Sequence, residues 1–237
     1  MPIARHSKIV AVLLGILAFQ SSLFALPMRF LPWDDEIAAR QIGITTGKEV
    51  VELQDLHPGK RSDPLQVKSG DVAPQLVAID RKTPEGKPVM VPLKIKPGIK
   101  APLVLIIPDP KHPTGLRPFV IEDDTANFPW GSVRVLNATG VELLILHEKI
   151  TKALPNSWNP VNIDQKGKAR NVGVQIAARA NPKKILYSGV WEHDPQVRKL
   201  AFLLPGTDGR TGEIATKIIP QDKRFVNPEK VSANTGN

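Results

Sequence analysis

Prolines at short intervals are the feature that most restricts the fold of this chain. There are 23 of them among the 237 residues, and they occur from one end of the sequence to the other. A proline inside a helix removes a backbone hydrogen bond and clashes with the preceding turn. Long helices are therefore excluded over most of the chain, and its core has to be built from short extended segments.

The stretches between the prolines have the patterns of β-strands. In three segments apolar and polar residues alternate, as expected of strands with one buried face: residues 75–79, 89–95 and 133–136. Two other segments are uninterrupted apolar runs, which indicates burial on both faces: residues 103–107 and 201–204. We therefore expect an all-β protein.

Turn-forming residues separate the expected strands. Glycine, proline, asparagine and aspartate cluster at five places: residues 84–86, 96–98, 137–140, 193–195 and 207–209. Two segments are weaker candidates for helices, 34–41 with acidic residues in its first turn, and 148–154. Many short strands at this spacing predict a β-sandwich or barrel.

The sequence also matches itself at an offset of 97 residues. Without a gap, this offset gives 13 identities over 90 positions, and it places Pro32 and Trp33 on Pro129 and Trp130. Several matched residues are Pro, Gly or Trp, which occupy positions where backbone geometry or bulk is restricted. We expect two tandem immunoglobulin-like sandwiches, residues 28–127 and 128–222, joined by the acidic stretch 122–125. Chance similarity among proline-rich β-sequences is the alternative.

The N-terminal residues 1–25 have the layout of a secretory signal peptide. Arg5 and Lys8 precede an apolar run of 11 residues, which is too short to span a bilayer as a helix. Cleavage near Ala25 leaves 212 residues with a formal net charge of +7. We therefore expect an exported protein, periplasmic or extracellular, with no transmembrane span in the mature chain. A retained membrane anchor is the alternative.

The charge and the lack of cysteine narrow the possible partners and chemistry. A basic surface attracts anions, so an anionic envelope component or an acidic protein is a possible partner. The cations are scattered, and we expect no nucleic-acid binding. With no cysteine, disulfides, thiol catalysis and cysteine-bound zinc are excluded. The tail, residues 223–237, is polar and is expected to be disordered.

No constellation of residues predicts catalysis, a metal or a cofactor. Two acidic clusters lie at residues 34–36 and 122–124, but neither has the spacing of a calcium loop, and a helix-cap or boundary role is simpler. Glu192, His193 and Asp194 resemble a chelating triplet but occupy an expected turn. Neither Ser132 nor Ser188 has a recognisable catalytic partner, and no nucleophile elbow occurs.

One aromatic residue is a candidate for binding. Trp158 lies between Pro155 and Pro160 in polar surroundings, where its ring could stack on a sugar or on a partner's side chain. The alternative is that it closes the open end of a sandwich. Trp33 and Trp130 are expected to pack in domain cores. The stretch 137–139 is a glycosylation sequon, relevant only in a glycosylating host.

Two resemblances support this interpretation. Around residues 31–40 and 128–137, the sequence resembles a group of uncharacterised exported bacterial β-proteins, which implies a location and a fold without an activity. The architecture also resembles that of periplasmic pilus-assembly chaperones, which are basic, two-domain, immunoglobulin-like proteins. The anchoring motif of that family is not found in the sequence.

The expected function is therefore non-enzymatic binding or scaffolding in the cell envelope. Two alternatives remain open. One is an assembly chaperone that acts by strand pairing, which predicts an exposed edge strand flanked by cations between the domains. The other is a hydrolase of envelope polymers, which needs a pocket with paired titratable groups.

Overall fold

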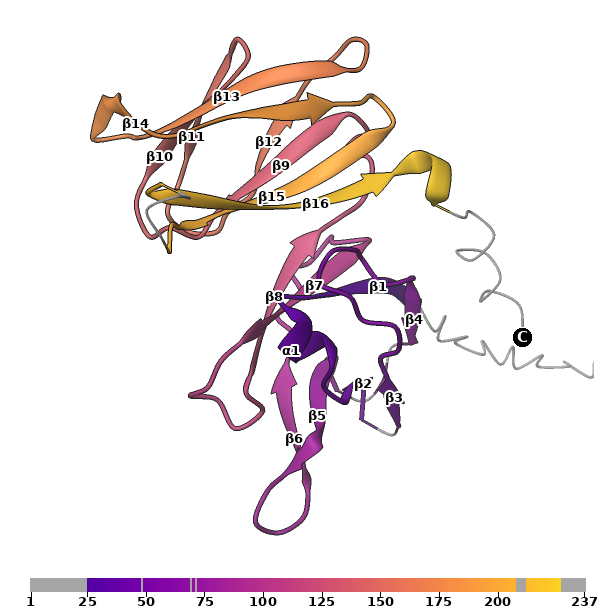
Figure 1. Cartoon of the computed structure of the whole chain (residues 1–237). Coiled ribbons are helices and arrows are strands. Elements are labelled where there is room, and N and C mark those ends of the chain that lie inside the picture. The colour runs from indigo at the N-terminus through magenta and orange to yellow at the C-terminus, as the bar shows by residue number, and fades with distance from the viewer. Residues whose placement is uncertain (1–24, 48, 69, 71, 208–211, 227–237) are drawn as a thin grey trace, which may run out of the picture.

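The computed structural model describes residues 25–226, apart from positions 48, 69, 71 and 208–211. Within these ranges the regular structure is almost entirely β, and sixteen strands form four four-stranded sheets (Figure 1). The expected all-β class is confirmed. No helix among the described residues is long and apolar enough to cross a membrane. The expected signal peptide, except Ala25, and most of the expected tail lie outside the described residues.

The first eight strands form two sheets, which together we name the N-terminal lobe. One sheet has the order β4 (Leu65–Lys68), β1 (Ala25–Pro32), β7 (Pro102–Pro108) and β8 (Leu116–Glu122). The other has the order β3 (Val50–Glu52), β2 (Ile42–Thr45), β5 (Gln75–Lys82) and β6 (Pro88–Pro92). The short helix α1 (Asp35–Ala38) follows β1.

The last eight strands form the C-terminal lobe. One sheet has the order β12 (Val161–Asp164), β9 (Ser132–Asn137), β15 (Val197–Pro205) and β16 (Ile214–Asp222). The other has the order β11 (Ile150–Leu154), β10 (Leu143–His147), β13 (Arg170–Ala178) and β14 (Asn181–His193). A single 3₁₀ turn, η1 (Lys223–Phe225), ends the described chain, so these first residues of the expected disordered tail have regular structure.

The two lobes have the same strand order. In each, the first, fourth, seventh and eighth strands share one sheet, and the first and seventh strands pair in parallel. An immunoglobulin constant domain instead places its first, second, fourth and fifth strands in one sheet. The sandwich architecture therefore agrees with the expectation, while the order of the strands differs from that of the immunoglobulin fold.

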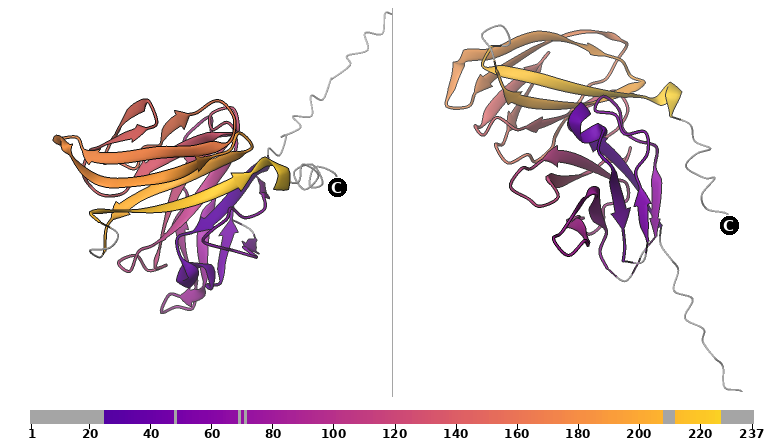
Figure 2. Two further views of the ribbon diagram at one scale, coloured as in Figure 1. Left: turned by 45° about the horizontal axis from the view of Figure 1, so that its top comes forward. Right: turned by 60° about the horizontal axis from the view of Figure 1, so that its bottom comes forward.

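Three apolar clusters hold the molecule together. The first lies between the two sheets of the N-terminal lobe, and the second lies between the two sheets of the C-terminal lobe. The third joins the lobes, because β7 and β15 carry apolar side chains on their second faces as well. Leu103 and Leu105 of β7 thus share a cluster with Leu200 and Phe202 of β15. This double burial confirms what the two uninterrupted apolar runs predicted, and Figure 2 shows the two lobes side by side.

The prolines that fall within the described strands lie where a strand ends or has one neighbour. Pro118 is in the edge strand β8, which pairs only with β7. Pro27 lies in the part of β1 that pairs with β4, before pairing with β7 begins at Arg29. A proline has no N–H to give to a second strand, so these are the positions a sheet tolerates.

Two expectations about local structure were wrong. The segment 148–154 is not helical but forms strand β11, reached from β10 by a two-residue turn in which Glu148 has a φ of 57°. Pairing with β10, together with the β-branched residues Ile150 and Thr151, outweighs the helical tendency of a segment this short. Trp33 and Trp130 do not fill lobe cores: Trp33 packs against the third cluster, and Trp130 stacks with the guanidinium of Arg198.

Candidate functional site

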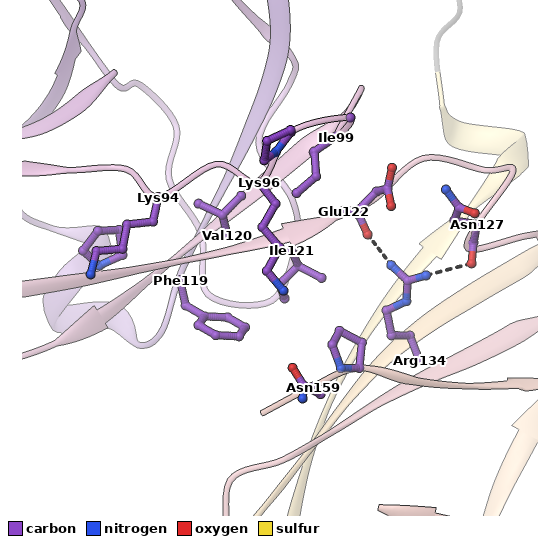
Figure 3. Close-up of a pocket in the computed structure, with 14 residues that line it drawn as sticks. Lys94, Lys96, Ile99, Phe119, Val120, Ile121, Glu122, Asn127, Arg134 and Asn159 are labelled. Atoms are coloured by element: carbon purple, nitrogen blue, oxygen red, sulfur yellow. Dashed lines mark hydrogen bonds between the residues drawn. The ribbon is translucent and has the colours of Figure 1, made fainter. Parts of the chain in front are cut away.

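A groove with a volume of about 750 Å³ lies between the two lobes. On the N-terminal side it is lined by β8 and by the segment that follows β6 (Figure 3). On the C-terminal side it is lined by Arg134 of β9 and by the loop at Asn159 and Pro160. Asn127 also lines it, and belongs to the segment between β8 and β9, residues 123–131, which we name the connector. We name it the interlobe groove.

The backbone of β8 presents unpaired hydrogen-bonding groups to this groove. Asp109 N donates to Gly115 O and Asp123 N donates to Ala101 O, which places the odd-numbered residues of β8 in hydrogen-bonded pairs with β7. Because such pairs alternate along an antiparallel ladder, the even-numbered residues direct their N–H and C=O groups away from β7. The outward groups are therefore Pro118 C=O, both backbone groups of Val120, and both of Glu122.

One of these outward groups has a partner in the C-terminal lobe. Glu122 O accepts a hydrogen bond from Nη1 of Arg134, as Figure 3 shows. Within the described residues, no backbone partner is recorded for Val120 N–H, Val120 C=O, Pro118 C=O or Glu122 N–H. Exposed groups of this kind can pair with an added strand.

The side chains of β8 alternate between the two neighbouring cores. Leu116 and Val120 pack in the N-terminal lobe, whereas Phe119 and Ile121 pack in the third cluster, toward the C-terminal lobe. The strand is therefore held on both faces and is open only along its edge. This packing on both faces holds the exposed edge of β8 in a fixed position, where a further strand could pair with it.

The wall of the groove opposite the C-terminal lobe is basic. Leu93 is buried and Ile95 packs against the same core. Lys94 and Lys96 alternate with these two residues and therefore point outward, and both are exposed. Neither lysine has an ion-pair or hydrogen-bond partner among the described residues. Figure 3 places both side chains beside β8.

Arg134 has a different role, because its donors are already used. Besides Glu122 O, it donates to Asn127 O at 2.7 Å and to Asn162 Oδ1 at 2.7 Å. Burial lowers the pKa of its guanidinium, an effect opposed by nearby carboxylates, first that of Asp123. Arg134 thus fixes the end of β8 and the connector relative to β9.

A buried ionic triad holds the two lobes in place behind the groove. Asp123 of the connector accepts hydrogen bonds from Arg61 Nε at 2.8 Å and Nη2 at 3.1 Å, and from Arg198 Nη2 at 3.1 Å. All three side chains are at most 2% exposed. Arg61 comes from the N-terminal lobe and Arg198 from β15, so one carboxylate bridges the lobes. We name these residues the Asp123 triad.

An aromatic ring packs against the arginines beside the Asp123 triad. Phe128 is fully buried, and the guanidiniums of Arg134 and Arg198 lie 4.6 and 4.9 Å from its ring centroid. Its carbonyl accepts a further hydrogen bond from Arg198 Nη1 at 3.0 Å. Burial lowers the pKa of Arg198 to about 10, although the carboxylate of Asp123 acts against this shift. Arg198 is therefore held by a charge, a carbonyl and a ring.

Trp158 lies in the third cluster. Its ring centroid is 5.5 Å from that of Phe119, 6.1 Å from that of Trp33 and 6.5 Å from that of Phe202, and the residue is half-buried. The guanidinium of Arg117 covers it at 5.7 Å. Its surroundings are therefore less polar than the neighbouring sequence implies, because residues distant in sequence supply the aromatic rings.

The two acidic clusters have structural partners. Asp34 caps α1 by accepting a hydrogen bond from Ile37 N, as the cap interpretation expected. Asp123 belongs to the triad, and Asp124 accepts from the backbone amides of Ala126 and Asn127. Among the described residues, no group of three or more His, Asp or Glu side chains is placed to hold a metal ion.

The two histidines of the C-terminal lobe are buried rather than solvated. His193 is the last residue of β14 and is 4% exposed, while Glu192 is exposed on the opposite face of the strand. The expected turn begins one residue later, at Asp194, so the triplet does not converge. His147 is 1% exposed and its Nδ1 has no partner, and burial lowers the pKa of its imidazole to about 4.

The glycosylation sequon is closed by internal hydrogen bonds. Asn137 is 1% exposed, and its Nδ2 donates to Val141 O at 2.7 Å and to Leu154 O at 3.3 Å. Its Oδ1 accepts from Thr139 N. In the folded protein the nitrogen that a glycan would need is therefore already used.

The comparisons with known proteins identify no relative. No protein-family model matches the chain, and no curated protein matches it significantly. The geometry of the groove is consequently the basis for a functional proposal.

Proposed function

We propose that the protein is a non-enzymatic binding protein that takes up an extended polypeptide segment in the interlobe groove by strand addition to β8. The observation that supports this proposal is the free edge of β8, where the outward groups of Pro118, Val120 and Glu122 line the groove. Main-chain hydrogen bonds to an exposed sheet edge are a recurring means of peptide recognition. The third cluster and the Asp123 triad support a preformed groove, which lowers the cost of binding.

The chemistry of the lining favours binding over hydrolysis. Among the residues that line the groove, Glu122 is the only carboxylate, and there is no histidine. A hydrolase of envelope polymers that works by acid–base catalysis would typically pair this carboxylate with a second carboxylate or a histidine, and the lining contains neither. Of the alternatives open from the sequence, an assembly chaperone that pairs strands is the form of binding that β8 favours.

The place of action is also a proposal. The layout of residues 1–25 supports export to the periplasm or beyond, where an anionic or acidic envelope protein would be the partner. The resemblance to uncharacterised exported β-proteins around residues 31–40 and 128–137 fits the same location.

We further propose that the two lobes arose by duplication of one sandwich. Their identical strand order supports this idea, as does the agreement of the 97-residue offset with the positions of β5, β7 and β8 relative to β13, β15 and β16. The offset does not hold at the start of the lobes, since Trp33 follows β1 but Trp130 precedes β9. The two packed sheets of each lobe support an origin from an immunoglobulin-like sandwich.

Proline at position 120 tests the strand addition. Val120→Pro removes an outward N–H and no hydrogen bond of the ladder with β7, while it replaces one apolar side chain by another. Its neighbour Phe119 is already extended, as the residue before a proline must be. Val120→Thr is the matched control, because it changes the side chain and keeps the N–H. Fluorescence anisotropy with labelled, uncharged ten-residue peptides of alternating Val and Thr measures the affinity.

We expect Val120→Pro to bind such peptides about tenfold more weakly than Val120→Thr, since one hydrogen bond is lost and the ring obstructs the ladder. Circular dichroism shows whether both variants remain folded. Equal affinity of two folded variants, or no binding of the original protein, would refute the proposal.

A further inference from the structure

The two lysines of the groove wall have a spacing that matches an added strand. Lys94 and Lys96 are two residues apart in a segment whose alternating burial is that of an extended chain. Alternate side chains of an extended chain lie on one face, about 6.6 Å apart along its axis. A peptide added to β8 has the same periodicity, so one of its faces presents every second side chain to this wall.

The charges along the groove are unbalanced. Lys94 and Lys96 lack ion-pair partners among the described residues, and the guanidinium of Arg134 donates to carbonyl and amide oxygens rather than to a carboxylate. Glu122 is the only acidic residue of the lining. A ligand that carries negative charge is therefore complementary to the groove.

From these two observations we infer that the segment bound by the groove is acidic, with carboxylates at alternate positions. Its recognition element is two Asp or Glu side chains separated by one residue, each facing one lysine. This inference rests on the proposed strand addition, which supplies the alignment of the peptide with the wall.

A single-stranded nucleic acid also carries regularly spaced negative charges. The peptide is favoured because β8, on the same side of the groove as the two lysines, presents a strand edge with both N–H donors and C=O acceptors, the pattern that a polypeptide backbone matches. An oligonucleotide would find no partners there for its acidic phosphates apart from Val120 N–H and Glu122 N–H. Oligothymidylate therefore serves as a competitor in the test.

The test compares three labelled ten-residue peptides that share the same apolar residues. One carries Glu at two alternate positions, one carries Gln at the same positions, and one carries two adjacent Glu residues, which point to opposite faces. Each is titrated by fluorescence anisotropy against the original protein and the double variant Lys94→Gln/Lys96→Gln. The control variant is Lys149→Gln/Lys152→Gln, which removes two exposed lysines of the C-terminal lobe.

We expect the alternating Glu peptide to bind about tenfold more tightly than the Gln peptide in 50 mM salt, from two exposed ion pairs. The preference falls to about twofold in 0.5 M salt, because exposed charges are screened. It disappears in Lys94→Gln/Lys96→Gln and persists in the control variant. The adjacent-Glu peptide falls between the other two.

The outcomes separate this inference from the proposed function. Equal binding of the Glu and Gln peptides would refute the acidic ligand and leave strand addition standing. Equal binding of the two Glu peptides would refute the alternate spacing. Binding of none of the peptides would overturn the proposed function itself, and displacement of the Glu peptide by micromolar oligothymidylate would overturn the assignment to a polypeptide.

Discussion

The Asp123 triad gives the sharpest prediction about stability. In Asp123→Asn the side chain keeps its shape but loses its charge, so Arg61 and Arg198 remain buried without a counter-charge. Three charge-assisted hydrogen bonds end on this carboxylate, at 2.8, 3.1 and 3.1 Å. The amide oxygen of asparagine can still accept the hydrogen bonds that end on one carboxylate oxygen. Its NH₂ group replaces the other oxygen and cannot accept a hydrogen bond from a guanidinium, so two donors face each other there.

The expected loss in the free energy of unfolding is about 4 kcal/mol. Breaking a buried ion pair by removing one partner costs about 3–5 kcal/mol, because the remaining charge stays desolvated. Hydrogen bonds to charged groups are each worth about 1.5–3 kcal/mol, so one or two lost bonds correspond to about 1.5–6 kcal/mol, a range that includes this value. The loss is far larger than that of a surface ion pair.

Urea denaturation followed by tryptophan fluorescence measures this loss. Glu142→Gln is the matched control, since Glu142 pairs with Arg179 where both side chains are more than half exposed. We expect it to cost less than about 1 kcal/mol. A loss below about 1 kcal/mol in Asp123→Asn, similar to the control, would show that the triad does not hold the lobes together.

Three further predictions concern buried polar and aromatic groups. His147 has a pKa of about 4 in the folded state and about 6.5 when unfolded, so its contribution of about 3 kcal/mol is complete above pH 6.5 and is lost as the pH falls toward 4. Denaturation at a series of pH values should show this slope, and His147→Gln should flatten it; an unchanged slope would assign it to other groups. Asn137→Ala should cost about 2–3 kcal/mol in urea denaturation, because Val141 O and Leu154 O lose their donor, and a loss like that of exposed Thr125→Ala would contradict this. Trp158→Ala should lower stability by about 2 kcal/mol through lost packing of a half-buried ring, and thermal unfolding measures this; an unchanged melting temperature would show that the ring contacts of Trp158 do not stabilise the fold.

The sequence predicted those parts of the fold that depend on local patterns. The uninterrupted apolar runs became β7 and β15, because a strand covered on both faces needs no polar side. The segment 75–79 became part of β5 for the complementary reason that its alternation matches one buried face. Strand β11 was missed, since its five residues have no clear period and depend on pairing with β10.

Local sequence patterns could not predict the candidate site. Asp123 meets Arg61 across 62 positions of the sequence and Arg198 across 75, distances at which no spacing rule applies. The edge status of β8 depends on sheet order, which the apolar pattern does not encode. For the lysines a signal was present, because the alternation through residues 89–95 already placed Lys94 on the polar face.

The third apolar cluster makes the lobes mutually dependent. Cutting the chain anywhere from residue 124 to 127 would leave each fragment with an exposed apolar sheet face, which includes Leu105 on the N-terminal fragment and Phe202 on the C-terminal fragment. Exposed apolar faces of this kind either cause aggregation or bind each other, which would reassemble the two fragments. Separately produced halves should therefore be poorly soluble alone and recover solubility when made together, because each half supplies the apolar face that covers the other.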